Sequence, residues 1–421
     1  MTASKTPEDF SLFDPAVLEC PFDFYAALRE QAPAYQIPMM GFWLVSRHED
    51  VKRIAADPAT FSSVYPELLG TGLSFSPRTD KLDELLGTGF PWKSSLLFTD
   101  PPVHTRHRRI IAEAFSPRRI RQLETSVREI AGELCDGIIA DLSASPGAEI
   151  DFVHRYSMPL TITVIADALG VDRTDTMRFK SWSDTVVERL GMLVPEERDL
   201  VLLADYVEFQ HYFVDLVEKR RREPQDDLLT DLVTARPGGD EPLDNEELLS
   251  FLTVLLVAGN QTSTSLLNSM LLHLLRDPAL MERVRADHTL IPALVEETLR
   301  YQSPIQTFFR KTTRDTVVGE VTIPAGSMVL VGFGAANRDE RRFSCPEAFD
   351  VNRPNAREHV AFSFGPHTCP GAGLGRSEAR IGMEVFLERF ARISLPESGE
   401  PRFMPNFMER TIAEFPIVLS S

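Results

Sequence analysis

A long, mainly apolar stretch of the chain lies between residues 245 and 276. From Leu248 to Leu275 it contains no Lys, Arg, Asp or Glu. Asp244 and Glu247 are spaced like a capping box just before the stretch, and Pro278 follows its end. These signals predict one helix about 48 Å long at 1.5 Å per residue. Because this helix is apolar on most sides, we expect it to be buried.

A stretch of this length without charges is also long enough to span a bilayer. Its middle, residues 259–265, reads GNQTSTS, a polar run that lipid disfavours. No basic cluster flanks the stretch. We therefore expect a buried core helix and no membrane span.

The pattern along the rest of the chain changes near residue 304. From about residue 105 to 302 the apolar positions have helical spacing almost throughout. Residues 305–331 instead alternate as strands do, with predicted turns at Gly319 and at residues 324–326. Short alternating runs at 42–45 predict a small sheet near the N-terminus, and a last helix is expected from about 371 to 388. The predicted fold class is mainly α with minor β sheets.

Composition is consistent with one large folded unit. No repeat, low-complexity tract or convincing linker interrupts the sequence, so we expect a single domain over residues 1–421. The net charge of −18 argues against nucleic acid and anionic lipid as partners, because both attract basic surfaces. There is no secretory signal, and the four cysteines lie far apart without a CxxC pair, which predicts a cytoplasmic protein without a zinc site.

Residues 362–371 read FSFGPHTCPG and contain the most informative cysteine of the chain. Gly365 permits a positive φ, so the backbone can turn tightly around the sulfur of Cys369. The helix expected just after Cys369 places its positive end near the sulfur, which favours the thiolate. Phe362 and Phe364 would keep water away from an iron held there.

This decapeptide resembles the cysteine-ligand signature of the cytochrome P450 family, F-x-x-G-x-x-x-C-x-G, at every defined position. The resemblance implies a P450-like fold, with a long central helix over a haem and the cysteine loop beneath it. It also implies that Cys369 is the axial ligand of one haem b.

Glu297 and Arg300 form an E-x-x-R pair about one helical turn apart, where their side chains can meet. Such a pair is common on helix surfaces and usually contributes little there. Its position before the cysteine resembles the E-x-x-R of the family. The resemblance implies a buried network with Arg353 that supports the cysteine loop.

Residues 100–109 read DPPVHTRHRR and predict a helix that begins with several cations. Cations at a helix N-terminus oppose the helix dipole, so a compensating anion is expected. The segment resembles the D-P-P-x-H-x-x-x-R pattern of the family. The resemblance implies that the haem propionates are bound by four residues: His104, Arg108, Arg310 and His367.

The segment AGNQT, residues 258–262, lies in the middle of the predicted long helix, where Gly259 weakens the helix and Thr262 can bond back to a carbonyl. It resembles the A-G-x-(D/E)-T segment of the family, which implies a kink that opens an oxygen-binding groove. Thr262 matches the family threonine, but Gln261 stands where the family has a carboxylate. An amide can position water but cannot exchange protons as a carboxylate does.

The resemblance predicts a haem-thiolate monooxygenase that inserts one oxygen atom from dioxygen into a small apolar substrate of aromatic or terpenoid type. Electrons are expected from a separate iron-sulfur ferredoxin with its NAD(P)H-dependent reductase. We expect the ferredoxin to dock on a group of five arginines. A separate group of mainly apolar residues is expected to line the substrate pocket. The arginines are Arg106, Arg109, Arg118, Arg119 and Arg121, and the pocket residues are Val254, Ala258, Ile305 and Gln306, with Phe407 or Met408.

Two alternatives remain at this point. Gln261 motivates a peroxide-driven oxygenation that needs no external electrons. A haem-binding sensor without turnover is the other alternative, and the retention of Thr262 counts against it.

Overall fold

The computed structural model describes most of the chain, namely residues 5–12, 14–38, 40–65, 76–144, 147–191, 194–239 and 241–420. Contacts between residues divide it into two compact units, each built from separated parts of the sequence. The first unit contains Met1–Ser62, Glu124–Leu160 and Gln261–Ser421, and the second contains Ser63–Leu123 and Thr161–Asn260.

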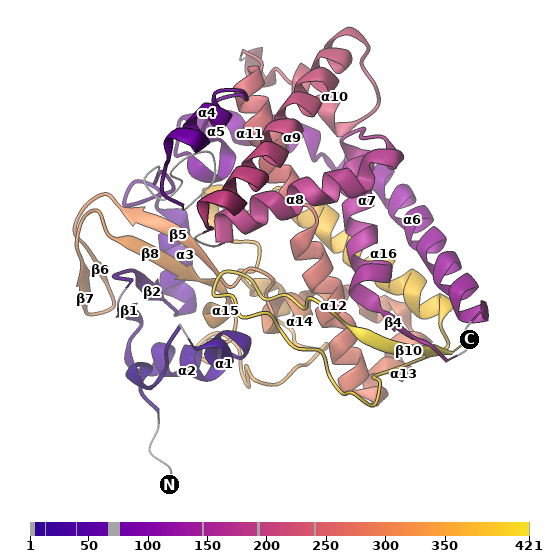
Figure 1. The fold of residues 1–421 in the computed structure, drawn as a ribbon. Helices are drawn as coiled ribbons and strands as arrows, with labels where there is room; N and C mark the ends of the chain where they lie inside the picture. The colour runs from indigo at the N-terminus through magenta and orange to yellow at the C-terminus, as the bar shows by residue number, and fades with distance from the viewer. Residues whose placement is uncertain are drawn as a thin grey trace. The chain divides into compact units, whose positions relative to one another are not determined.

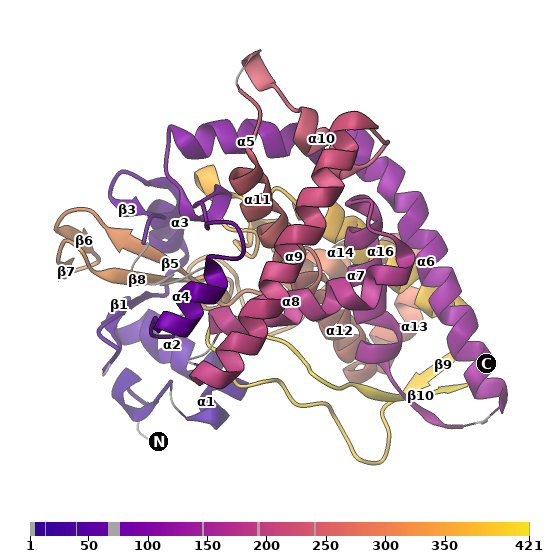
Figure 2. The same cartoon turned by 45° about the horizontal axis from the view of Figure 1, so that its top comes forward.

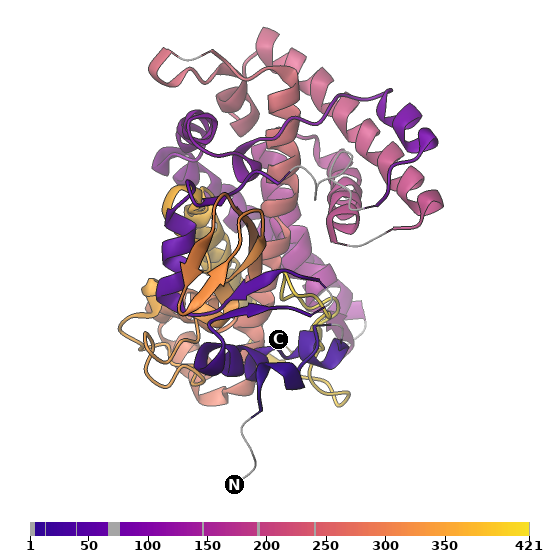
Figure 3. The same cartoon turned by 90° about the vertical axis from the view of Figure 1, so that its left-hand side faces the viewer.

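A five-stranded sheet in the first unit joins the start of the chain to the strands predicted after residue 304. Figure 3 shows the orange strands β5 and β8 beside the indigo strands of the N-terminal part. Strands β2 and β8 are parallel, and the other neighbours are antiparallel. In spatial order the strands are β1 (Ala34–Gln36), β2 (Trp43–Val45), β8 (Met328–Gly332), β5 (Thr307–Thr312) and β3 (Phe61–Ser62).

Two smaller sheets complete the strands of the first unit. β6 (Thr316–Val318) and β7 (Val321–Ile323) form a hairpin, and Gly319 in its turn has a φ of +62°. The predicted turn at Gly319 is therefore confirmed. The third sheet has β10 between two partners, and Figure 2 shows β10 beside β9 near the C-terminus. Its strands are β4 (Glu149–Asp151), β9 (Arg392–Ser394) and β10 (Pro416–Ser420).

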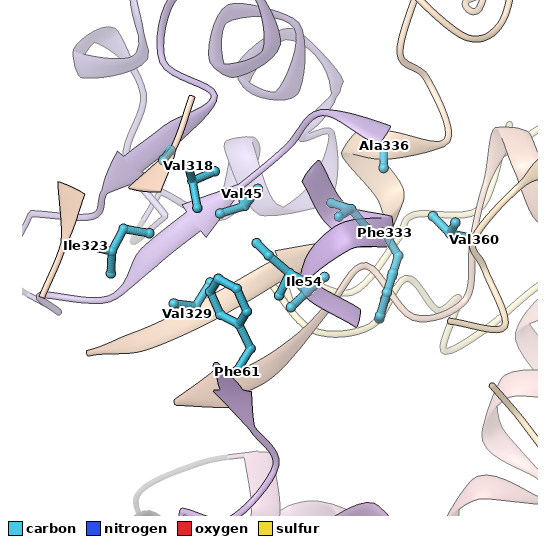
Figure 4. Packing of buried hydrophobic residues seen from close by; sticks show 12 residues of the cluster. Val45, Ile54, Phe61, Val318, Ile323, Val329, Phe333, Ala336 and Val360 are labelled. Carbon is cyan, nitrogen blue, oxygen red and sulfur yellow. The ribbon is translucent and has the colours of Figure 1, made fainter. Parts of the chain in front are cut away.

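The hydrophobic core under the large sheet combines residues that are far apart in the sequence. Val45 and Val329 come from the paired strands β2 and β8, and Ile54 comes from α3 (His48–Ala56). Figure 4 shows these side chains with Phe61 and Phe333 around them. This core fixes α3, against which the cysteine loop packs.

The other regular elements described for the first unit are helices. α16 packs against α12 and α14 (Figure 1), and Gly382 on α16 allows close approach because a Cβ there would lie 2.8 Å from Leu160 Cδ2. The helices are α1 (Pro15–Glu19), α2 (Phe22–Gln31), α3, α12 (Gln261–Arg276), α13 (Pro278–Ala286), α14 (Ile291–Tyr301), α15 (Phe333–Ala336) and α16 (Ala372–Arg389).

The second unit is helical in all the regular elements described for it. α8 packs along α9, and α9 along α4 and α10. Two further helices, α6 (Pro117–Ala144) and α7 (Met158–Ala168), carry residues of both units. The others are α4 (Asp80–Leu86), α5 (Val103–Ala114), α8 (Thr176–Gly191), α9 (Glu196–Arg222), α10 (Leu228–Thr234) and α11 (Asn245–Ala258).

The predicted helix over 245–276 begins and ends as expected but is not continuous. Its capping box is confirmed, because Asp244 and Glu247 each accept the other's backbone N–H. Gly259 and Asn260 interrupt it and separate α11 from α12. The Asn260 side chain donates to the Leu256 carbonyl at 3.0 Å and competes there with the helix backbone. None of the described helices is long and apolar enough to cross a membrane.

Candidate active site

The loop that carries Cys369 is closed by its own backbone. The Cys369 N–H donates to the Phe362 carbonyl at 2.8 Å, and Gly365 has a φ of +69°. A Cβ atom on Gly365 would lie 2.8 Å from the Cα atom of Ala56, at the end of α3. Glycine therefore lets the loop reach α3, and the predicted positive φ of Gly365 is confirmed.

Helix α16 begins three residues after Cys369, at Ala372. The first N–H groups of a helix have no partner within the helix and carry partial positive charge. A sulfur near this end is stabilised as thiolate rather than thiol. A Cβ on Gly371 would lie 3.8 Å from the Cys369 sulfur, so the glycine also leaves that side of the sulfur open.

The four cysteines differ in their suitability as an iron ligand. Cys369 is half-buried, whereas Cys135 is fully buried and burial raises its pKa to about 12. Cys20 and Cys345 are exposed. A thiolate ligand needs a stabilised anion that another group can still reach. The environment of Cys369 fits this requirement, and that of Cys135 does not.

The predicted contact of Glu297 with Arg300 and Arg353 is confirmed. Arg300 donates to both carboxylate oxygens of Glu297 at 2.8 Å, and Arg353 Nε lies 3.1 Å from Glu297 Oε1. The Glu297 and Arg300 side chains are completely buried. Both arginines also donate to the Ala348 carbonyl, so the network joins α14 to the irregular segment before the cysteine loop.

A second network begins at the neighbouring residue, Glu296, and reaches the cysteine loop itself. Arg376 Nε donates to Glu296 at 2.6 Å, and His359 Nε2 lies 3.1 Å from the same carboxylate. Burial opposes ionisation of Glu296, but the hydrogen bonds with His359 and Arg376 outweigh it and lower its pKa to about 2. The Arg376 guanidinium lies 4.5 Å from the ring centre of Phe362. Sequence reasoning missed this network, and the paired glutamates at 296 and 297 were its only signal.

Gln261 and Thr262 begin α12, directly after the break in the predicted long helix. The Gln261 amide donates to the Thr411 hydroxyl at 3.3 Å, a contact between residues 150 positions apart. Gly259 has a packing role, because a Cβ there would lie 2.9 Å from Ile165 Cγ1 on α7. Glycine at this position therefore lets α11 and α7 pack closely.

The predicted propionate ligands occur in both units. In the second unit, His104 and Arg108 lie one turn apart on α5, so their side chains share one face of the helix. In the first unit, Arg310 is a buried residue of β5 whose Nη1 lies 2.7 Å from the Phe309 carbonyl. His367 lies two residues before Cys369 and is half-buried.

A family model described as Cytochrome P450 matches residues 62–414. The chain belongs to the cytochrome P450 family. Cytochrome P450 107B1 of Saccharopolyspora erythraea is 34% identical over 99% of each chain. The structure of CYP109Q5 from Chondromyces apiculatus is similar, with a TM-score of 0.85, 35% identity and 98% of both chains covered.

Other similar structures contain bound molecules. The P450 CREJ in complex with (4-ethylphenyl) dihydrogen phosphate has a TM-score of 0.87 and 31% identity, over 96% of this chain and 98% of CREJ. CYP109E1 from Bacillus megaterium in complex with testosterone has a TM-score of 0.80 and 29% identity, over 95% and 99% of the two chains.

Membership of the P450 family establishes the reaction class. The protein is a P450 monooxygenase, and its family works with a haem whose iron is held by a cysteine thiolate. Its reaction involves dioxygen, a substrate and redox partners.

The predicted substrate residues of this P450 occur on elements of both units. In the second unit, Val254 and Ala258 lie one turn apart on one face of α11, and Ala258 is exposed although Leu255 and Leu256 are buried. This face of α11 is therefore partly open at Ala258.

In the first unit, Ile305 and Gln306 do not face the same way. Ile305 is half-buried, whereas Gln306 is buried, donates to the Ser303 carbonyl and packs on Gly334. Neighbours in an extended segment project to opposite faces, and of the two residues Ile305 is the partly exposed one. That both residues face the substrate stays a prediction. Phe407 and Met408 are both half-buried.

The five arginines proposed as a docking face are not equivalent. Arg106 donates to Glu247 at 2.9 Å, and Arg119 forms ion pairs with Asp226 and Asp231 at 2.8 Å. These two cations are compensated within the second unit, and the five-residue docking face stays a prediction. The remaining three are exposed: Arg109, Arg118 and Arg121.

Proposed function

We propose that this P450 inserts one oxygen atom from dioxygen into a small, largely apolar substrate of aromatic or terpenoid type. Its electrons come from a separate iron-sulfur ferredoxin and the NAD(P)H-dependent reductase of that ferredoxin. The cofactor is haem b, and the protein works in the cytoplasm as one domain. The observation that carries the proposal is the Cys369 loop, which combines a half-buried sulfur, a helix N-terminus and a glycine-closed backbone.

In this proposal Cys369 holds the iron through its thiolate. When bound, the haem supplies the activation of dioxygen and the transfer of one oxygen atom. The donors for the two propionates are His104, Arg108, Arg310 and His367, and their histidine and arginine side chains are chemically suited to carboxylates. The networks around Glu296 and Glu297 hold the cysteine loop in place.

Thr262 and Gln261 handle protons near the oxygen. The Thr262 hydroxyl can donate a hydrogen bond to oxygen and accept one from water. The Gln261 amide is neutral and is already directed toward Thr411, so it positions water and does not carry the proton.

The substrate preference rests on the side chains that remain partly open. Ile305, Phe407 and Met408 are half-buried apolar residues of the first unit, and Ala258 is an exposed small residue of the second. Testosterone in CYP109E1 and the ethylphenyl group in CREJ are likewise apolar bodies.

The test is a screen of small apolar compounds for a change of the iron spin state in the visible spectrum. Compounds that bind are then tested with a ferredoxin, its reductase and NADH, and oxygen consumption and hydroxylated product are measured. We expect substrate-dependent oxygen consumption with product formation. If no binding compound stimulates oxygen consumption with any donor, the proposed monooxygenation is wrong and the sensor alternative is favoured.

Peroxide-driven oxygenation is a second candidate, because Gln261 replaces the expected carboxylate and contacts Thr411. Turnover with hydrogen peroxide alone, at a rate matching or exceeding that with ferredoxin and NADH, would favour it.

A further inference from the structure

Glu409 is an acidic residue of the first unit whose carboxylate has no partner among the residues that the structure describes. It is half-buried, and burial alone raises its pKa. No described residue forms an ion pair or a side-chain hydrogen bond with its carboxylate. A carboxylate that is largely removed from bulk water and left unpaired is costly, so a carboxylate in this position points to a partner that binds there.

The direction of the Glu409 side chain follows from the segment around it. Gln306 N–H donates to the Met408 carbonyl at 2.7 Å, and Arg410 N–H donates to the Pro304 carbonyl at 2.8 Å. These bonds flank Glu409 and Ile305 as a non-hydrogen-bonded antiparallel pair. Side chains of such a pair lie on the same face and close together. Glu409 therefore projects beside Ile305, a half-buried residue of the proposed pocket.

The neighbours of Glu409 confirm this alternation. Arg410 turns the other way, because its guanidinium lies 3.8 Å from the ring centre of Phe403 and donates to the Glu19 carbonyl. Thr411, two residues after Glu409, contacts Gln261 at the start of α12. Glu409 and Thr411 thus share the face that is turned toward the residue before Thr262.

We propose that Glu409 determines substrate specificity by binding a cationic nitrogen on an otherwise apolar substrate. Its unpaired carboxylate lies beside apolar Ile305, on the face that meets the oxygen-activating end of α12. A protonated or quaternary amine would supply the missing counter-charge, while its hydrocarbon part would contact Ile305. This inference rests on the proposed function and makes it more specific.

The test uses two probes of nearly the same shape and different charge. Phenyltrimethylammonium carries a permanent positive charge and has no free electron pair for the iron, whereas tert-butylbenzene is its neutral isostere. Dissociation constants are measured by calorimetry on the haem-loaded protein at pH 8.5, because alkaline pH favours the ionised form of a carboxyl whose pKa is raised by burial. We expect the cation to bind about tenfold more tightly than the neutral probe, or better.

Two variants that each remove one negative charge distinguish an effect of Glu409 from an effect of the protein's net charge. Glu409→Gln should abolish the preference for the cation, whereas Glu414→Gln, which removes an exposed carboxylate five residues further on, should retain it. Glu409→Met serves the same purpose if the glutamine variant does not fold. A wild-type protein without the preference would overturn the inference, and so would a preference that survives loss of the Glu409 carboxylate.

The same samples distinguish this inference from the proposed function. Each is first reduced and treated with carbon monoxide to verify thiolate ligation. A wild-type protein without the thiolate spectrum contradicts the proposed function, whereas a normal spectrum without cation preference contradicts the role of Glu409 alone.

Discussion

Glu378 is a buried carboxyl outside the two glutamate networks, and its environment has consequences at the scale of one residue. It lies on α16, is 1% exposed, and burial raises its pKa to about 8 despite a hydrogen bond with Ser263. The carboxyl is therefore mostly protonated at neutral pH. Because an ordinary glutamate has a pKa near 4.5, folding favours the neutral form of Glu378.

This difference predicts a pH-dependent effect of Glu378→Gln. Because the pKa of Glu378 is higher in the folded than in the unfolded state, it does not reduce the stability of the wild type below pH 4.5. The stability of the wild type then decreases as pH rises from 4.5 to 8. The variant should gain stability relative to the wild type over that range, by about 3 kcal/mol at pH 7. Urea unfolding from pH 5 to 8 measures the gain, with exposed Glu388→Gln on the same helix as control. A gain that does not change with pH would contradict a raised pKa.

Thr262 and Gln261 should differ in their effect on coupling between electron use and product. Thr262→Ala should raise the loss of electrons to hydrogen peroxide sharply, because in the proposed function the hydroxyl would donate a hydrogen bond to oxygen. Gln261→Glu should change turnover and peroxide loss, while substrate affinity changes little, and Gln261→Ala should have a modest effect because water can replace the amide. Product and peroxide per NADH are measured together. Equal coupling in all three variants would mean that protons arrive by another path.

At the scale of elements, the positions of the cysteine loop and α16 depend on the Glu296 network. Glu296→Gln removes the carboxylate charge that His359 and Arg376 stabilise, and these partners lower the pKa of Glu296 to about 2. The variant should therefore cost about 3 kcal/mol of stability at pH 7. In the wild type this contribution is present above pH 4.5 and is lost as pH falls toward 2. Urea unfolding measures the cost, with exposed Glu282→Gln as the matched variant. Equal midpoints at pH 7 would show that Glu296 does not stabilise the loop.

Patterns along the sequence predicted those elements whose signals are local. The capping box of α11, the strands after residue 304 and the turn at Gly319 all follow from neighbouring residues. The break after Ala258 was expected only as a kink. The full interruption of the helix involves Asn260, whose side chain donates to both the Leu256 carbonyl and the Ser183 hydroxyl on α8. A partner 77 positions away cannot be read from periodicity.

In the candidate site, too, local motifs were predictable from the sequence and contacts between distant residues were not. The Cys369 loop and the Glu297 network were recognisable because their motifs are short. The contacts of Gln261 with Thr411 and of Gln306 with Gly334 were not recognisable from the sequence. They depend on the tertiary fold, which brings the C-terminal segment beside α12 and the residues after β8 beside Gln306. Glu409 carried no sequence signal, because only the fold shows that no residue of the described ranges pairs with its carboxylate.

At the scale of the whole molecule, charge distribution predicts how the electron donor docks. On a chain of net charge −18, the exposed Arg109, Arg118 and Arg121 are a suitable surface for an acidic ferredoxin. Arg118→Glu or Arg109→Glu should weaken the apparent affinity of the donor and reduce its salt dependence, with haem content unchanged. Exposed Arg283→Glu is the control. Reduction kinetics that are unchanged at low salt would place the docking face elsewhere.

The central claim is that Cys369 binds the iron as a thiolate, and the spectrum of the reduced carbon monoxide adduct tests it most directly. The wild type should show the long-wavelength Soret band typical of thiolate ligation. Cys369→Ser should abolish this band, whereas serine at Cys20, Cys135 or Cys345 should leave it intact. A freshly prepared wild-type protein with only the shorter-wavelength band of a neutral or nitrogen ligand would contradict the assignment, as would a Cys369→Ser variant that keeps the long-wavelength band.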